Sequence, residues 1–238
     1  MTDLEGRVIA IAGAAGGLGP VVARRLAGAG ATLALTDVDT GRLDALITDL
    51  DLPDERVDAR VVDLLDEDEA RRWAAGLEER FGATDGLLHL VGGWRGGLPH
   101  AEAPLADYAW LHDLLVRTLQ HATRAFYEAL RESAHGRFVL VSSSQAQSPS
   151  GTNAAYAATK AAAESWTLAL ADSFRVDESA ATANVLVVNA ILTPQMREQE
   201  PDNPFSTFTS AEDIADACVY LCSDAAAKMN GKRLPLYP

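Results

Sequence analysis

The sequence predicts an α/β protein in which a doubly wound parallel sheet of about seven strands carries helices on both faces. Three observations lead to this fold class. Apolar strand-like runs alternate with helical patterns over the whole length, which is typical of a parallel sheet with crossover helices. The strand-like runs are almost continuously apolar, which indicates burial on both faces. No linker, repeat or low-complexity tract interrupts the chain, so we expect one domain over residues 1–238.

The expected elements follow one another in a regular order. RVIAIA forms the first strand, and a glycine-rich turn leads from it into the first helix. Strands are expected at residues 7–12, 32–36, 57–62, 86–91, 137–143, 183–190 and 232–237. Helices are expected between them, near residues 18–29, 40–49, 66–81, 105–133, 154–175 and 211–223. Loops 92–104 and 193–209 follow strands, so both belong to the carboxyl edge of the sheet, where doubly wound proteins bind ligands.

The composition limits the kinds of partner. A net charge of −14 disfavours nucleic acid and anionic membrane as partners, whereas an anionic cofactor can still be bound by backbone amides. The N-terminus has no basic or long apolar leader, and no apolar run approaches the ~20 residues of a membrane helix. We therefore expect a cytoplasmic protein with a small-molecule substrate. Cys218 and Cys222 are expected to be core thiols, and no metal site is predicted.

Tyr156 and Lys160 carry the strongest chemical signal. They are four residues apart in a helical stretch, so the phenol and the ammonium share one helix face. A nearby cation favours the phenolate, and we expect it to lower the pKa of Tyr156 toward the working pH. Ser143 ends the apolar run FVLV thirteen residues earlier. The three side chains together predict proton donation and acceptance in alcohol/carbonyl chemistry. Taken one at a time, each also has an ordinary structural interpretation: Ser143 as a strand cap, Tyr156 as a core residue and Lys160 as a solvated helix residue.

The cofactor signal is a turn containing Gly13, Gly17 and Gly19 between a strand and a helix. Such glycines let the backbone approach a pyrophosphate, and the helix start supplies free amides. Asp37 ends the second strand, where a carboxylate accepts hydrogen bonds from the adenosine ribose and repels a 2′-phosphate. We therefore predict NAD over NADP, with a turn aspartate as the alternative for Asp37. Asp63 ends the third strand, where it meets the adenine amino group or caps the next helix.

With these glycines, Ser143, Tyr156 and Lys160 in register, the chain resembles the short-chain dehydrogenase/reductase family over essentially its whole length. The resemblance implies a Rossmann-type domain that transfers hydride between nicotinamide and a substrate carbon. It implies that Tyr156 is the general acid/base, that Lys160 binds the nicotinamide ribose and that Ser143 orients the substrate oxygen. It also implies a homodimer or homotetramer formed through the two long helices. The implied cofactor contacts further include Ala15, Leu18, Leu64, Val91, Gly92, Ile191 and Thr193.

Several positions depart from the pattern of the family. The motif after the fourth strand begins with His89 in place of asparagine, and Leu115 occupies the position of a frequent active-site asparagine. LLHLVGGWRGG (87–97) and residues 188–216 locally resemble dihydropteridine reductases. Reduction of a quinonoid pterin is therefore an alternative to an alcohol/carbonyl substrate. A non-catalytic NAD-binding regulatory protein is the alternative from another class.

The substrate residues are predicted from the loops. Trp94 is suited to stack on a flat ring and Arg95 to pair with an acidic or polar edge, unless the loop that carries them is mobile surface. Gln145 is expected to add a polar contact beside Ser143. His89 lies in a buried strand and is expected to be a hydrogen-bonded core residue. Loop 193–209 is expected to close over bound substrate, because loops of this length often act as lids.

Overall fold

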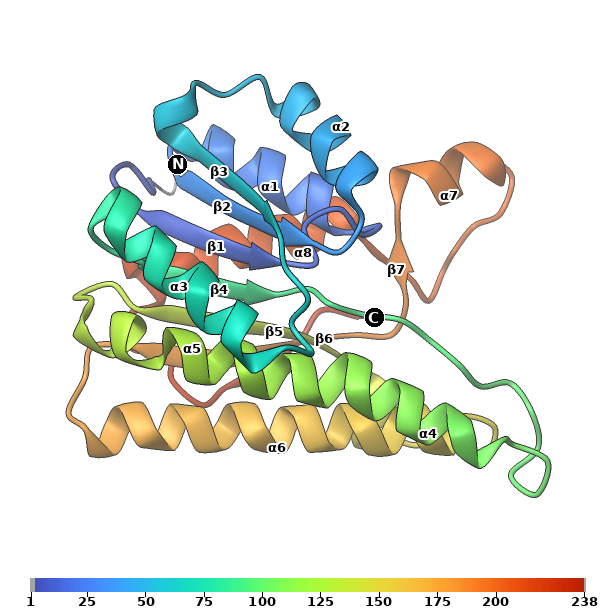
Figure 1. Cartoon of the computed structure of the whole chain (residues 1–238). Coiled ribbons are helices and arrows are strands. Elements are labelled where there is room, and N and C mark those ends of the chain that lie inside the picture. Colours follow the sequence, from blue (N-terminus) through green and yellow to red (C-terminus); the bar gives the residue numbers. More distant parts are fainter. Residues whose placement is uncertain (1–2, 238) are drawn as a thin grey trace.

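A computed structural model describes residues 3–237 and confirms the predicted fold class. Seven parallel strands form one sheet in the order β3-β2-β1-β4-β5-β6-β9 (Figure 1). Their bounds are β1 (Val8–Ala12), β2 (Thr32–Asp37), β3 (Val57–Val61), β4 (Gly86–His89), β5 (Arg137–Ser143), β6 (Thr182–Val188) and β9 (Arg233–Pro235). The order reverses between β1 and β4, and such a switch point is where doubly wound sheets bind ligands.

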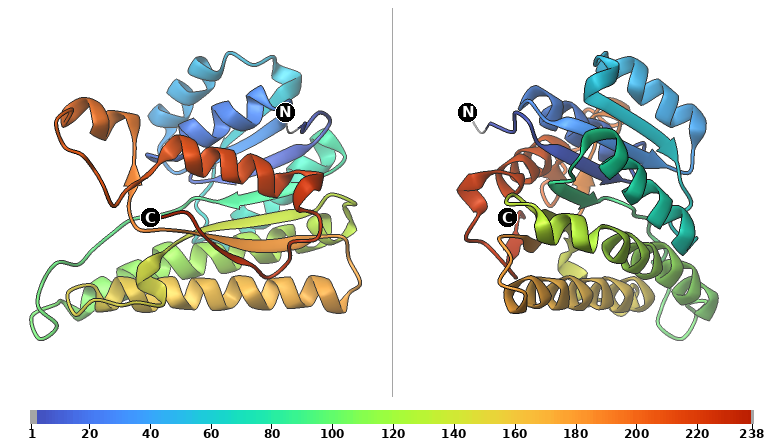
Figure 2. Two further views of the ribbon diagram at one scale, coloured as in Figure 1. Left: turned by 180° about the vertical axis from the view of Figure 1, so that it is seen from behind. Right: turned by 60° about the vertical axis from the view of Figure 1, so that its left-hand side comes forward.

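Helices cover both faces of the sheet (Figures 1 and 2). One face packs against α1 (Gly19–Gly28), α2 (Thr40–Leu50) and α8 (Ala211–Cys222). The other packs against α3 (Glu67–Phe81), α5 (Thr118–Glu132) and α6 (Ala154–Val176). Each face has its own apolar cluster, which explains why the strands read as continuously apolar.

Strand β1 contributes side chains to both apolar clusters. Ile9 and Ile11 belong to the cluster with α1 and α8, whereas Ala10 and Ala12 belong to the cluster with α3, α5 and α6. Because side chains of a strand alternate between faces, the bulky pair packs on one side and the small pair on the other. The small side chains leave room on their side for large ones such as Trp73, whose ring meets Phe126 edge-on with centroids 4.8 Å apart.

Two predicted segments differ in detail from the structure. The helix expected over 105–133 consists of α4 (Leu105–His112), a π-helical turn (Asp113–Arg117) and α5. Loop 193–209 contains α7 (Pro194–Gln199), which Figure 1 shows projecting from the body of the molecule. The segment is framed by β7 (Ile191–Leu192) and β8 (Thr209–Ser210), which pair in parallel. Thr193 caps α7, because its hydroxyl accepts a hydrogen bond from the Met196 amide at 3.2 Å.

Cys218 and Cys222 are buried free thiols of α8, as the sequence predicted, and burial raises the pKa of Cys222 to about 12. A thiol with so high a pKa stays protonated and unreactive at neutral pH. Across residues 3–237, every helix is too short or too polar to cross a lipid bilayer.

Candidate active site

The carboxyl edge of the sheet brings together most of the predicted site residues. The strands run parallel, so the segments after β1, β2, β4, β5 and β6 all emerge at this edge. The glycine turn follows β1, Asp37 ends β2, and His89 ends β4. Ser143 ends β5, and Thr193 lies just beyond β7.

The glycines of the turn are required by close backbone contacts. Gly13 has a φ of +79°, and a Cβ on it would lie 2.8 Å from the backbone nitrogen of Val91. A Cβ on Gly19 would lie 2.1 Å from the carbonyl oxygen of Ala14. Larger residues at either position would push the turn away from the segment after β4 or from the start of α1. The turn is therefore held tightly against the end of β4, as a dinucleotide cradle requires.

The start of α1 is suited to an anionic group. Leu18 is its N-cap residue and provides no side-chain hydrogen bond, and a proline follows Gly19. The Val21 and Val22 amides donate to the Leu18 carbonyl, so the Gly19 amide is the donor of the first turn that is left for a ligand. Gly17 lies beside Thr193, since a Cβ on it would be 3.3 Å from the Thr193 methyl group. The turn after β1 and the segment after β6 thus meet at one place, and the residues present fit the pyrophosphate of a dinucleotide.

Asp37 is fixed by the turn itself. Its carboxylate accepts hydrogen bonds from the Ala15 amide at 2.9 Å and from the Val38 amide at 2.8 Å. Oδ1 also accepts a hydrogen bond from the Asp39 amide at 3.3 Å. A carboxylate has about four acceptor positions, so Oδ2, which accepts only from Ala15, retains a lone pair for a ribose hydroxyl. Val38 is 68% exposed beside it and offers no cation to a 2′-phosphate. The position of Asp37 therefore fits the role that the sequence predicts for it.

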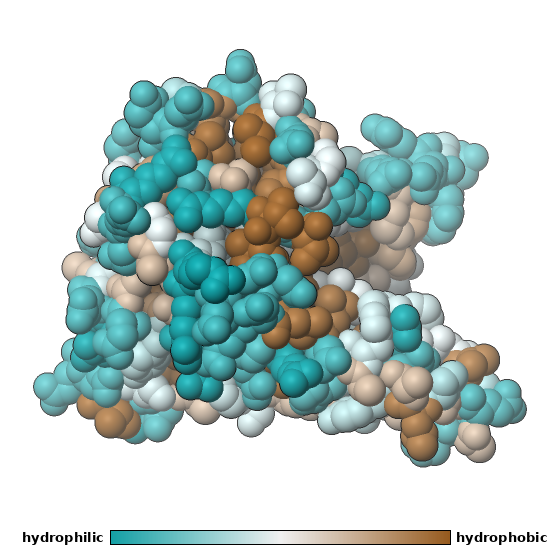
Figure 3. All heavy atoms as spheres, in the orientation of Figure 1, coloured by the Kyte–Doolittle hydropathy of each residue, from teal (hydrophilic) through white to brown (hydrophobic). Residues whose placement is uncertain are grey.

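The segment after β3 supplies an apolar surface next to Asp37. Asp63 accepts a hydrogen bond from the Leu65 amide at 2.9 Å, while the helix cap of α3 is Asp66. Asp63 therefore stabilises a turn before the helix and leaves its second oxygen available. Leu64 is buried, whereas Val61 and Leu65 are 51% and 43% exposed. Figure 3 shows hydrophobic surface gathered over this segment, which suits a flat apolar ring such as adenine.

Ser143, Tyr156 and Lys160 converge between β5 and α6. Ser143 is buried at the end of β5 and accepts a hydrogen bond from the Gln145 amide at 3.2 Å. The Lys160 ammonium lies 5.9 Å from the centre of the Tyr156 ring. It donates a hydrogen bond to the Val141 carbonyl at 3.0 Å, two residues before Ser143. The i, i+4 spacing on α6 thus places both side chains against the end of β5.

The predicted lowering of the Tyr156 pKa is wrong for this structure. Burial raises the pKa of the Tyr156 phenol, and hydrogen bonding with Ser143 offsets part of that rise. Burial lowers the pKa of Lys160 to about 8, against the opposing influence of the Glu164 carboxylate. The sequence prediction considered only the charge of the lysine. Removal of both groups from water, which penalises their charged forms, has the larger effect here.

The predicted substrate residues do not converge on one place as the catalytic residues do. The Arg95 guanidinium lies 4.0 Å above the Trp110 ring and 3.3 Å from the Asp107 carboxylate, so it contacts α4. Trp94 is 58% exposed. Gln145 accepts a hydrogen bond from the Ser150 amide at 2.8 Å and shapes the loop after β5. Of these side chains, the structure leaves Trp94 the freest to meet a ligand.

Asn189 is a site-forming residue that the sequence reading did not identify. Its side-chain oxygen accepts a hydrogen bond from the Ser144 hydroxyl at 3.0 Å, and its amide donates to the Thr207 carbonyl at 3.1 Å. Asn189 therefore ties the loop next to Ser143 to the returning end of segment 193–209. A polar residue directly after the apolar run of β6 was the signal available in the sequence.

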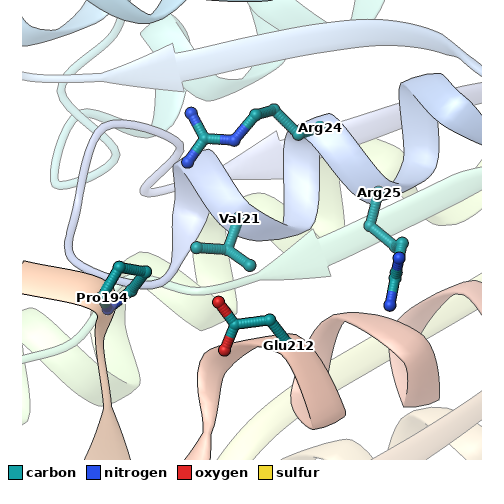
Figure 4. A pocket seen from close by; sticks show the side chains of 5 residues that line it. All are labelled: Val21, Arg24, Arg25, Pro194 and Glu212. Carbon is teal, nitrogen blue, oxygen red and sulfur yellow. The ribbon is translucent and has the colours of Figure 1, made fainter. Parts of the chain in front are cut away.

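Segment 193–209 is packed on itself beyond this tie. The rings of Phe205 and Phe208 meet edge-on with centroids 5.1 Å apart, and the Arg197 guanidinium lies 5.0 Å from the Phe205 ring. A cavity of about 260 Å³ opens where the segment leaves the body. Figure 4 shows Val21 of α1, Pro194 and Glu212 around this cavity. Among residues 3–237, no group of three or more His, Cys, Asp or Glu side chains is arranged to hold a metal ion.

Comparisons with known proteins agree with this geometry. The family model described as enoyl-(acyl carrier protein) reductase matches residues 13–236. The chain is 26% identical to a 7alpha-hydroxysteroid dehydrogenase of Escherichia coli (strain K12), over 97% of this chain and 92% of the relative. It is 32% identical to a 2,3-dihydro-2,3-dihydroxybenzoate dehydrogenase of Bacillus subtilis (strain 168), over 70% of this chain and 64% of the relative.

Solved structures of dehydrogenases are also similar to this chain over nearly its whole length. A glucose/ribitol dehydrogenase of the short-chain dehydrogenase/reductase type from Brucella melitensis superimposes with a TM-score of 0.84 at 30% identity, covering 99% of this chain and 97% of that one. A gluconate 5-dehydrogenase from Burkholderia cenocepacia J2315, solved with NADP and tartrate, gives a TM-score of 0.85 at 25% identity, covering 98% and 94%.

The fold and site define a dinucleotide-dependent α/β oxidoreductase. This chain belongs to the short-chain dehydrogenase/reductase family, and it is an NAD(P)-dependent oxidoreductase of small molecules. The comparisons give no support to the local resemblance to dihydropteridine reductases, nor do they favour the pterin-reducing and regulatory alternatives.

Proposed function

We propose that this protein transfers a hydride between NAD(H) and the carbon of an alcohol/carbonyl group in a small molecule, with Tyr156 as the general acid/base. The observation that carries this proposal is the convergence of Ser143, Tyr156 and Lys160 beside the glycine turn. Names of relatives such as hydroxysteroid dehydrogenase and levodione reductase support an alcohol/carbonyl substrate.

The roles of the side chains follow from their chemistry. When bound, the nicotinamide supplies the hydride in reduction and takes it up in oxidation. As the carbonyl π electrons move onto the substrate oxygen, the Tyr156 hydroxyl gives that oxygen a proton. The Ser143 hydroxyl orients the oxygen by donating a hydrogen bond to it, and the positive charge of Lys160 stabilises the phenolate left behind. Oxidation reverses these transfers.

The raised pKa of Tyr156 suits one direction of this chemistry. Burial raises that pKa, so the phenol is protonated at neutral pH. The protonated phenol is the form that donates to a carbonyl oxygen, and the unliganded chain is therefore prepared for reduction. Desolvation also strengthens the interaction of Lys160 with a phenolate formed in the reaction.

The preference for NAD over NADP is supported by Asp37 and its surroundings. The Asp37 carboxylate is fixed by the Ala15 and Val38 amides, where it repels a 2′-phosphate and accepts hydrogen bonds from ribose. Arg42, the next cation along the chain, lies 3.4 Å from the Asp39 carboxylate. A 2′-phosphate would therefore lie near the Asp37 carboxylate, while Arg42 is paired with Asp39.

Segment 193–209 is proposed to close over the substrate. Asn189 connects its returning end with the loop next to Ser143. Closure of the segment would therefore move groups beside the reacting oxygen. Limited proteolysis tests this idea, with slower cleavage in the segment expected when NADH and a turned-over carbonyl are both present. Equal cleavage rates with and without the ligands would refute closure.

The cofactor is tested first. Purified protein is titrated with NADH and with NADPH while quenching of tryptophan fluorescence is followed. We expect NADH to bind at least about tenfold more tightly, which corresponds to about 1.4 kcal/mol. Tighter binding of NADPH would overturn the role of Asp37, and failure of the folded protein to bind either would overturn the proposed function.

The chemistry is then tested with Tyr156→Phe, and Tyr220→Phe is the matched control. Tyr220 is 42% exposed on α8, away from the carboxyl edge, and its hydroxyl contacts the Met229 sulfur. A panel of ketones and aldehydes is screened by loss of NADH absorbance. We expect Tyr156→Phe to lose turnover by at least about 10²-fold while binding NADH as the wild type does. Equal turnover by Tyr156→Phe and Tyr220→Phe would refute general acid catalysis by Tyr156.

A further inference from the structure

His89 is a fully buried polar residue at the catalytic edge of the sheet. It is the last residue of β4, aligned with Ala12 of β1 and Leu140 of β5, and it is 1% exposed. Its side chain lies on the sheet face covered by α5, where it contacts Thr118. A buried imidazole normally has partners for both ring nitrogens, so the contacts of each nitrogen are informative.

The hydrogen bond of the Thr118 hydroxyl determines which nitrogen of His89 carries the proton. The Thr118 amide bonds to the Asp113 carbonyl, five residues back, and the Thr118 hydroxyl donates to the Leu114 carbonyl at 2.6 Å. Because the hydroxyl proton is committed to Leu114, the 3.2 Å contact between Thr118 Oγ1 and His89 Nε2 requires the nitrogen to be the donor. The neutral imidazole is therefore protonated on Nε2, and Nδ1 is a bare acceptor.

That acceptor has no partner among residues 3–237, and it is buried. An unsatisfied buried acceptor is destabilising, and native proteins commonly satisfy it with an internal water. Lys160 provides suitable donors nearby, because its ammonium bonds to the carbonyl of Val141, the residue that follows Leu140, the partner of His89 in the pairing of β4 and β5. Its ammonium has three protons, and in the described part of the chain it donates one hydrogen bond, to Val141. Its charge reaches His89, since burial and the Lys160 ammonium together lower the pKa of His89 to about 3.

We propose that His89 is a positioning residue for the reaction, acting through one internal water that donates to His89 Nδ1 and accepts from the Lys160 ammonium. The water and the Val141 carbonyl would then fix two directions of the ammonium, so that its remaining proton points toward the reacting groups. Thr118 holds the imidazole in the tautomer that makes this possible. This role rests on the proposed function of Lys160, and it adds a residue that never touches the substrate.

The tautomer and the bridge are tested by NMR, without any need for turnover. In protein labelled with ¹⁵N-histidine, the nitrogen shifts of His89 report which atom is protonated and whether the other accepts a hydrogen bond. We expect a protonated Nε2 and a hydrogen-bonded Nδ1 in the wild type. In Lys160→Met, which keeps an apolar chain of similar length, the Nδ1 resonance should move toward that of a free acceptor. A protonated Nδ1 in the wild type, or an unmoved resonance in Lys160→Met, would overturn the proposal.

The effect on the reaction is tested with two His89 variants that each keep one polar position. His89→Asn places a polar atom near the position of Nδ1, whereas His89→Gln reaches the position of Nε2 and keeps the bond to Thr118. We expect kcat to be about tenfold higher in His89→Asn than in His89→Gln, about the effect of one hydrogen bond. The Kd for NADH should differ less than about twofold between them, because the glycine turn and Asp37 are unchanged. Equal kcat values, or the reverse order, would overturn the proposal.

These measurements separate the two proposals. Loss of turnover in the wild type with every carbonyl tested would refute the proposed function, while the NMR result would still decide the contacts of His89. Turnover by the wild type with equal kcat values in the two variants would refute the role of His89 and leave the proposed function standing.

Discussion

The protonation of His89 predicts a specific loss of stability in acid. Burial and the Lys160 ammonium lower the pKa of His89 to about 3 in the folded chain, whereas an unfolded histidine titrates near 6.5. The unfolded chain therefore binds the proton first as the pH falls. The free energy of unfolding falls with pH through this window, by about 5 kcal/mol in all, since each pKa unit corresponds to about 1.36 kcal/mol. Between pH 7 and pH 4.5 the share of His89 is about 2.5 kcal/mol.

Urea unfolding at pH 7 and at pH 4.5 measures this contribution directly. His89→Asn removes the titration, so its free energy of unfolding should fall by about 2.5 kcal/mol less than that of the wild type between the two pH values. Carboxylates that titrate in the same range cancel in the comparison if they are independent of His89. His100→Asn, at an exposed histidine, should follow the wild type. An equal loss in wild type and His89→Asn would refute the assignment of a buried, neutral imidazole.

Two further substitutions test the turn and the core. Gly19→Ala would place a Cβ 2.1 Å from a backbone oxygen, so we expect a loss of about 1–3 kcal/mol in urea unfolding and weaker NADH binding. Gly28→Ala in the same helix has open space and should stabilise by about 0.5–1 kcal/mol; equal effects of the two would contradict the steric argument. Glu164→Gln breaks a buried pair with Arg233 at 2.8 Å and should cost about 3–5 kcal/mol, while Asp172→Asn at an exposed pair should change little. A small loss from Glu164→Gln would show that the buried pair is not needed for stability.

Much of the fold could be predicted because its strands are buried on both faces. A strand such as β5 is apolar at successive positions (138–141), and its last residues are Ser142 and Ser143. The π-helical turn over Asp113–Arg117 could not be predicted, because it differs from α-helix by a shift of one residue in hydrogen bonding and has no residue signature of its own. The signal for α7 was present, since Thr193 followed by Pro194 is a common helix start.

The relative positions of the site residues could be predicted where sequence spacing decides them. The protonation of those residues could not, because it depends on burial in the folded chain. The i, i+4 relation placed Tyr156 and Lys160 together, and the glycine turn placed Asp37 near a cofactor cradle. The sign of the Tyr156 pKa shift depended on how much water the folded chain removes, which spacing does not reveal. Arg95 was predicted near a substrate, but its contacts with Asp107 and Trp110 on α4 depend on where the loop turns.

The burial of Lys160 is itself an argument for a functional site. Its pKa of about 8 lies below the ordinary 10.4 of lysine, so holding the ammonium in the folded chain at pH 7 costs about 3 kcal/mol. A methionine could occupy the same space without that cost, and the Val141 carbonyl is a modest compensation. Folds retain such an expense chiefly where chemistry requires the charge. The chain keeps a destabilising cation beside a buried phenol, which is what the proposed stabilisation of a phenolate requires.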